Sequence, residues 1–186
     1  GCSDREGGMM RARAYTSLGA IFGAVCLAVG LTASPAHAGH EQYPFADNGD
    51  HYMDRVNLTS YGDAAAVHGR DQLNRAAGFN ATFSGTGDAE IHDYAYGDTG
   101  WHGRTSCTDW LVYGLVCDEF YVKFNLSSMG TSMSRWRSLG CHELGHTVHL
   151  GHRDNNDDSN DNSCMRVEIW PEDYDNHDLD VIEAAY

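Results

Sequence analysis

The chain is 186 residues long and carries 12 Lys and Arg against 27 Asp and Glu, a formal charge of −15. That length fits one domain, and 41 % hydrophobic residues is more than a disordered chain contains. The acidic balance excludes a nucleic-acid binder, because phosphate contacts require Lys or Arg, and it argues against stable membrane association. A small acidic globular protein remains, and its 11 histidines point to metal chemistry.

The first 38 residues have the pattern of a secretory signal peptide. Arg11 and Arg13 precede an uncharged apolar stretch at residues 18–31, and an A-x-A cleavage site ends at Ala38. A membrane-spanning helix needs about 20 apolar residues, whereas this stretch has 14. We therefore expect a secreted, extracellular protein cleaved after Ala38. Residues 1–8 precede the first methionine and are interpreted as a start-site artefact.

Removal of this leader leaves four cysteines: Cys107, Cys117, Cys141 and Cys164. An even number in an oxidising compartment favours disulfide bonds, for which three connectivities exist. We favour Cys107–Cys117, which closes a short local loop, together with Cys141–Cys164, which brackets the histidine motif described below. A four-cysteine zinc site is the alternative, but no C-x-x-C spacing supports it.

The mature chain is expected to consist of a flexible arm, residues 39–50, and one folded domain, residues 51–186. Alternating apolar residues predict strands at 55–59, 79–83 and 91–96. Between the first two strands, a helix is expected from Asp63, as its N-cap, to Gly78, as its stop.

The second half of the domain is predicted to contain an edge segment, a strand and two helices. The Gly-rich residues 97–106 are expected to run along a sheet edge, followed by a strand at 120–124. Residues 134–150 read as a helix capped by Ser134, and Pro171 is expected to start a last helix. This order of elements is typical of an α+β domain.

The strongest chemical signal is the segment HELGHTVHLGH, which runs from His142 to His152. His142 and His146 are four residues apart, so both imidazoles project from one face of a helix about 6 Å apart along its axis. That spacing suits two nitrogen ligands of one zinc ion. Glu143 lies about 100° around the helix, where it can take a proton from a zinc-activated water as general base.

A third zinc ligand is needed, and His152 is the favoured candidate. Gly151 offers the turn that would swing His152 back towards the metal. His149 is the alternative third ligand, but its position places it far along the helix axis from the midpoint of His142 and His146.

The extended pattern resembles the metzincin metallopeptidases, in which H-E-x-x-H-x-x-G-x-x-H is followed by a Met-turn. Met165 lies 13 residues after His152, and the resemblance, closest to matrixin-like and small bacterial extracellular members, covers most of residues 51–186. It implies a zincin with a small mixed sheet, an active-site helix, a Met-turn beneath the metal and a C-terminal helix. It also implies that residues 103–106 match an edge strand that pairs with extended peptide substrates.

Two positions depart from this family pattern. His149 stands where the family has glycine, so either its backbone is strained by about 1–3 kcal/mol or it takes the place of His152 on the metal. Val167, two residues after Met165, stands where astacin-like and serralysin-like members carry tyrosine. An additional tyrosine ligand is therefore not expected at that position.

Two further metal sites are weaker hypotheses. Residues 154–162 are a run of Asp, Asn and Ser that could bind Ca²⁺, although the run lacks the glycine and closing glutamate of an EF-hand loop, and a solvated loop is favoured. A second, structural zinc site would draw on histidines outside the motif: His40, His51, His68, His92, His102 and His177.

The sequence thus predicts a secreted, monomeric zinc endopeptidase that hydrolyses peptide bonds of protein or peptide substrates. Its predicted metal ligands are His142, His146 and His152, and its predicted catalytic residue is Glu143. One alternative is a zincin that takes Glu168 or Glu172 as third ligand. Another is a non-catalytic secreted zinc-binding module on the same fold.

Overall fold

A computed structural model describes residues 43–153, 162–167 and 170–186. The expected signal peptide, the start of the arm and most of the Asp- and Asn-rich run lie outside these residues. Within the described part of the chain, no helix is both long enough and apolar enough to cross a membrane.

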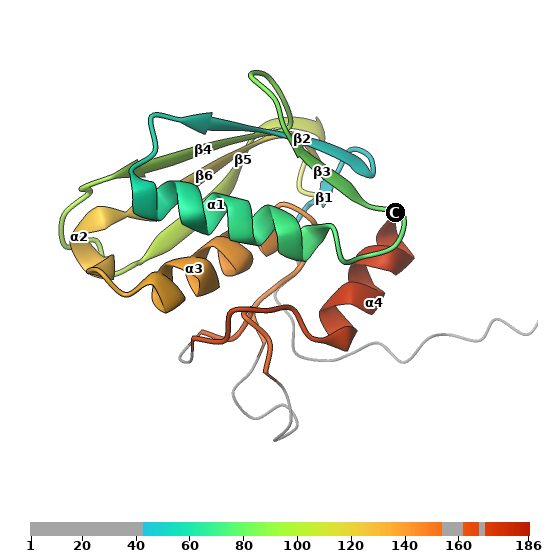
Figure 1. The fold of residues 1–186 in the computed structure, drawn as a ribbon. Helices are drawn as coiled ribbons and strands as arrows, with labels where there is room; N and C mark the ends of the chain where they lie inside the picture. Colours follow the sequence, from blue (N-terminus) through green and yellow to red (C-terminus); the bar gives the residue numbers. More distant parts are fainter. Residues whose placement is uncertain (1–42, 154–161, 168–169) are drawn as a thin grey trace, which may run out of the picture. The chain divides into compact units, whose positions relative to one another are not determined.

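Among the described residues, six strands form one mixed sheet (Figure 1): β1 (Phe45–Ala46), β2 (Asp50–Val56), β3 (Asn80–Phe83), β4 (Ala89–Tyr94), β5 (Gly103–Val112) and β6 (Val116–Asn125). Neighbouring strands in the order β3, β2, β4, β6 are parallel, and β1 is also parallel to β6. Only β5 is antiparallel, pairing with β6 in a hairpin. The expected mixed sheet is therefore present, with its strands mostly parallel and β5 at an edge.

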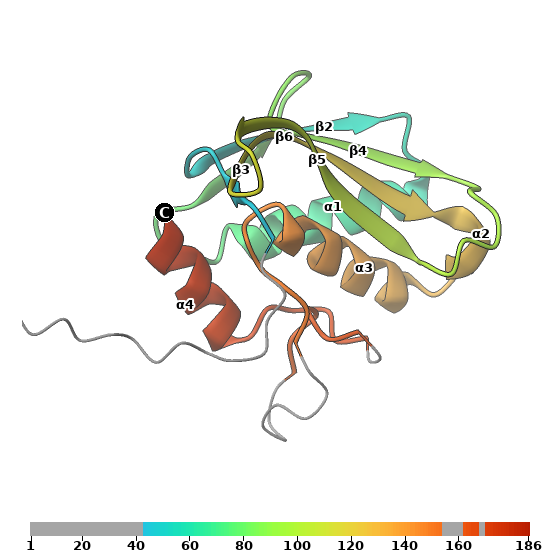
Figure 2. The same ribbon diagram turned by 180° about the vertical axis from the view of Figure 1, so that it is seen from behind.

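In the described part of the chain, four helices accompany the sheet: α1 (Ser60–Leu73), α2 (Leu126–Met129), α3 (Met133–His146) and α4 (Asn176–Ala185). The helices α1 and α3 lie side by side on the same face of the sheet (Figures 1 and 2). Their backbones touch at Gly140, where a Cβ atom would collide with the carbonyl oxygen of Ala65. Only glycine allows this close contact, which holds α3 firmly against α1.

The core fills the space between the sheet and these two helices. Ile91, Val122 and Phe124 point inward from the central strands, and Leu73 and Leu144 meet them from the helices; each is fully buried. Burial of such side chains stabilises the fold by about 1.5–3 kcal/mol each. Helix α3, which carries His142 and His146, is therefore held against the sheet by its apolar face.

Two helix boundaries differ from the sequence-based expectation because side-chain caps outweigh other local signals. The first helix begins after Thr59, whose hydroxyl accepts a hydrogen bond from the Gly62 N–H (3.2 Å), and it ends well before Gly78. The last helix does not start at Pro171. Asp175 caps it, in a reciprocal capping box with Asp178.

The boundaries of α3 also differ from the expected 134–150. The helix runs from Met133 to His146, and Ser132, rather than Ser134, precedes it as N-cap. It stops early because the Leu150 N–H donates to the carbonyl of Gly145 (3.1 Å), which closes the chain into a turn.

The described part of the segment expected to be a flexible arm, from Tyr43 onward, contacts the rest of the fold. Strand β1 pairs with the start of β6, and the Phe45 N–H donates to the carbonyl of Leu115 (2.9 Å). The Ala46 N–H donates to the hydroxyl of Tyr186 (2.8 Å). These hydrogen bonds, which the residue types did not predict, hold the segment to the sheet and to Tyr186 at the end of α4.

The two favoured disulfide bonds are both confirmed. Cys107–Cys117 joins β5 to β6, with Cα atoms 5.8 Å apart, and Cys141–Cys164 joins α3 to the loop before α4, with Cα atoms 6.0 Å apart. The second bond links α3 to the segment that contains Met165.

Candidate metal centre

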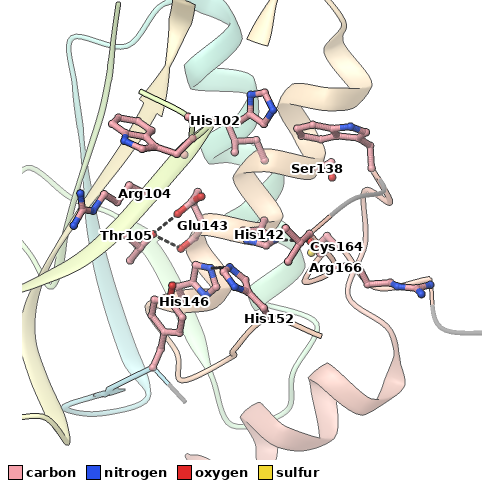
Figure 3. A pocket seen from close by; sticks show the side chains of 17 residues that line it. His102, Arg104, Thr105, Ser138, His142, Glu143, His146, His152, Cys164 and Arg166 are labelled. Carbon is pink, nitrogen blue, oxygen red and sulfur yellow. Dashed lines mark hydrogen bonds between the residues drawn. The ribbon is translucent and has the colours of Figure 1, made fainter. Parts of the chain in front are cut away.

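The helix α3 carries the first part of the motif into a pocket of about 410 Å³. Figure 3 shows His142, Glu143 and His146 in this pocket, with His152 beside His146. Residues from β5 and from the segment after Cys164 form its other walls. The site is thus assembled from elements far apart in sequence.

The structure brings the three predicted metal-binding histidines together. One nitrogen from each of His142, His146 and His152 lies within 4.8 Å of the others, and the Nε2 atoms of His146 and His152 are 3.1 Å apart. Two nitrogens bound at 2.0–2.1 Å to a tetrahedral zinc ion would be about 3.3 Å apart. The donor set therefore fits zinc in its chemistry, and the separation of His146 and His152 fits it in spacing.

Backbone carbonyls orient two of these rings for metal binding. The Nδ1–H of His142 donates to the carbonyl of Cys164 (2.8 Å), and the Nδ1–H of His146 donates to the carbonyl of Leu150 (2.8 Å). With the proton on Nδ1, the Nε2 lone pair of each ring is available to a metal ion.

The charge state of these two rings is also suitable for a metal ion. Burial lowers the pKa of His142 to about 4, against the opposing effect of its bond to the Cys164 carbonyl. Burial and the neighbouring His142 lower the pKa of His146 well below its usual value. Both imidazoles are consequently neutral at pH 7, the form that binds metal.

Glu143 lies in the same pocket, 4 % exposed, between the helix and strand β5. The hydroxyl of Thr105 is 2.8 Å from its Oε2 atom (Figure 3). A Cβ atom on Gly103 would collide with the carboxylate, so glycine leaves the space that Glu143 occupies. Burial raises the pKa of Glu143 to about 8, although the hydrogen bond with Thr105 lowers it.

Met165 is fully buried against the helix between the two histidines of α3. A Cβ atom on Gly145 would lie 2.5 Å from its sulfur, so the side chain occupies the space that this glycine leaves. The hydroxyl of Tyr174 donates to the carbonyl of Cys141 (2.7 Å) and supports α3 from the same side. This is the region in which the resemblance expects a Met-turn.

His149 does not join the histidine cluster. It has φ 75°, in the left-handed region, as expected where the family pattern has glycine. Its Nδ1–H donates to the carbonyl of Tyr43, and its ring stacks on Phe45. Within the described residues, the group that could hold a metal ion is His142, His146 and His152.

The structure does not place the alternative third ligand Glu172 at the histidine cluster, and Glu168 lies outside the described residues. Glu172 lies 3.5 Å from Arg137 in an ion pair and does not join the histidine cluster. Glu168 and most of the expected calcium run lie outside the described residues. Val167 borders the pocket and is 62 % exposed. Of the other histidines, those within the described part of the chain form no second group able to hold a metal ion.

Sequence reasoning missed two side chains of the site, Thr105 and Tyr43. Thr105 lies 38 residues before Glu143 in the chain, and Tyr43, whose ring stacks on His146, falls in the segment expected to be flexible. The only sequence signal was the expected edge strand at residues 103–106, which did not single out the hydroxyl of Thr105.

Comparison with known proteins shows a likeness in fold. No family model matches the chain and no curated protein matches it in sequence. One solved structure of myroilysin matches at a TM-score of 0.51 and 13 % identity, covering 75 % of this chain and 93 % of that one. A second, a crystal structure of myroilysin, gives a TM-score of 0.49 at 12 % identity, covering 80 % and 93 %. At this identity the likeness shows a shared fold alone.

Proposed function

We propose that this protein is a secreted zinc endopeptidase of metzincin-like, matrixin-like architecture that acts as a monomer. His142, His146 and His152 would hold the zinc ion, and Glu143 would be the general base. The observation that carries the proposal is the placement of Glu143 and the three histidines in one pocket beside a sheet edge. The fold shared with myroilysin supports it.

The chemistry of this proposal divides between the metal and the protein. A bound zinc ion would supply Lewis acidity towards water and a substrate carbonyl. Glu143 would accept the proton of the attacking water on its carboxylate and then pass it to the leaving nitrogen. Burial of Glu143 raises its pKa in the metal-free chain, which strengthens its carboxylate as a proton acceptor.

Strand β5 suits the binding of an extended peptide. Gly103, Arg104 and Thr105 line the pocket, and β5 pairs with β6 on one side only, so its other edge has no strand partner among the described residues. Backbone N–H and C=O groups on such an edge can pair with a peptide chain. The substrate would then cross the pocket beside Glu143, which favours cleavage within a chain.

Hydrolysis of casein by the purified mature chain tests the proposal. We expect the wild-type protein with zinc to cleave casein, and Glu143→Gln to lose activity by about a hundred- to ten-thousandfold while still binding one zinc ion. A chelator should abolish activity and added zinc should restore it. Intact casein after prolonged incubation with zinc-loaded wild-type protein would instead support a non-catalytic zinc-binding module.

The third ligand is tested by zinc content. We expect His152→Ala to lose tightly bound zinc and Glu172→Gln to retain it, because, among the described residues, it is His152 that lies with His142 and His146. The reverse result would establish the alternative zincin with a glutamate ligand.

A further inference from the structure

His149 holds the segment from Tyr43 to Ala46 against the turn that follows α3. Its Nδ1–H donates to the carbonyl of Tyr43, and its ring lies parallel to that of Phe45, with centroids 3.6 Å apart. Glycine would adopt the backbone conformation of this position without steric cost. The histidine side chain therefore offers contacts to the segment that a glycine could not make.

Tyr43, held in this way, lies on the histidine cluster. Its ring stacks on His146 with centroids 3.8 Å apart and planes 12° apart, and it meets the edge of His152 at 6.0 Å. It also borders the pocket. One face of the His146 ring is thus covered by a residue more than 100 positions earlier in the chain.

We propose that His149 is a positioning residue that clamps Tyr43 over His146, which makes the segment 43–46 part of the metal site. The bond from His149 fixes the Tyr43 backbone, and the Tyr43 ring then limits rotation of the His146 imidazole and shields it from water. The carbonyl of Leu150 fixes that imidazole at Nδ1, and the stacked ring fixes its plane. A metal ion consequently meets a preorganised ligand.

Metal binding by the histidine cluster does not depend on the proposed function, whereas any effect of Tyr43 and His149 on catalysis rests on it. Groups that orient metal ligands typically contribute about ten- to a hundredfold to metal affinity. We expect Tyr43→Ala to weaken zinc binding by that factor and Tyr43→Phe, which keeps the stacked ring, to bind zinc as the wild type does. Tyr113→Ala is the control, because Tyr113 is 90 % exposed at the β5–β6 turn.

His149 is tested through coupling to Tyr43. We expect His149→Gly to weaken zinc binding while keeping one zinc ion per chain. The double variant Tyr43→Ala, His149→Gly should bind within about twofold of Tyr43→Ala alone, because residues that act through one contact are not additive. If His149 were itself a ligand, its replacement by glycine would instead remove the tight site.

The measurement is competition for zinc between the full mature chain and a chromophoric chelator, with the thermal midpoint of each metal-free variant recorded beside it. If Tyr43→Ala does not fold, Tyr43→Leu, which keeps apolar volume without an aromatic ring, carries the same expectation. Wild-type zinc affinity in the folded Tyr43 variant, or full additivity in the double variant, would overturn the clamp. Inactivity of the wild type on casein, with these affinity differences present, would count against the proposed function alone.

Discussion

The hydroxyl of Thr105, on strand β5, lies 2.8 Å from both the Oε2 atom and the carbonyl oxygen of Glu143, on helix α3. A hydroxyl has one proton and two acceptor positions. Thr105 can therefore donate to the helix carbonyl while accepting from a protonated carboxyl, or donate to the ionised carboxylate. The contact lets Glu143 keep a hydrogen-bond partner in both of its charge states.

Replacement of Thr105 by valine should therefore slow peptide hydrolysis without removing the metal. Valine keeps the shape of the side chain but cannot hydrogen-bond, and the loss of a hydrogen bond to a charged group costs about 1.5–3 kcal/mol. We expect kcat to fall by about ten- to a hundredfold. Thr105→Ser, which keeps the hydroxyl, should retain most of the activity, and both variants should bind zinc equally. An unchanged kcat in Thr105→Val would show that Glu143 is held in place by other contacts.

The raised pKa of Glu143 predicts how the stability of the metal-free protein depends on pH. Burial raises this pKa to about 8, so the folded state binds more protons than the unfolded state above the usual carboxyl pKa. The contribution of Glu143 to stability should then fall as pH rises towards 8. The lowered pKa values of the buried histidines His51, His142 and His146 act in the opposite direction, because stability rises as pH passes through the unfolded-state histidine pKa of about 6.5. The raised pKa of Asp178, about 6, acts in the same direction as that of Glu143, mostly below pH 6.5.

Between pH 6.5 and 8 we expect the free energy of unfolding of the chelator-treated wild type to fall by about 2 kcal/mol relative to that of Glu143→Gln. Urea denaturation at a series of pH values measures this change. Glu143→Gln, which cannot ionise, should lack this decrease and keep only the pH dependence of the other groups. Parallel profiles for the two proteins would mean that another group causes the dependence.

The two disulfide bonds should contribute differently to metal binding. Each closes a loop whose chain entropy predicts about 3 kcal/mol of stabilisation. Only Cys141–Cys164 adjoins a histidine contact, because the Cys164 carbonyl accepts the bond from His142 Nδ1. We expect Cys141→Ala, Cys164→Ala to lower zinc affinity about tenfold. The matched control, Cys107→Ala, Cys117→Ala, should destabilise the fold with zinc affinity unchanged. Equal zinc affinity in the two double variants would show that Cys141–Cys164 has no special role in metal binding.

The contact between α1 and α3 should not tolerate a methyl group at Gly140. Helix propensity alone favours alanine over glycine by about 1 kcal/mol, but a Cβ atom here would collide with the carbonyl of Ala65. We expect Gly140→Ala to lower the free energy of unfolding by about 1–3 kcal/mol. Gly85→Ala, where no atom lies within 4 Å of a Cβ, should change it little. A more stable Gly140→Ala protein would show that α1 and α3 can separate without cost.

The sequence by itself determined the features that depend on residues close together in the chain, such as the alternation of a strand or the spacing along a helix. The alternation of residues 79–83 predicted a strand that the structure places at Asn80–Phe83, and the spacing of His142 and His146 placed both imidazoles on one helix face. These predictions held because the period of a helix or a strand depends only on nearby residues. The start of the last helix was predicted wrongly because the capping box of Asp175 with Asp178 competed with the signal from Pro171.

Tertiary structure alone decided how the site is completed. Nothing near residue 149 in the sequence shows that its side chain turns away from the metal cluster to hold Tyr43, 106 residues earlier. Likewise, the partnership of Thr105 with Glu143 exists only because β5 lies along α3. Such contacts depend on how the sheet and helices pack, and residue type and spacing do not encode them locally. The histidine spacing therefore determined which chemistry is available, and packing decided which side chains orient it.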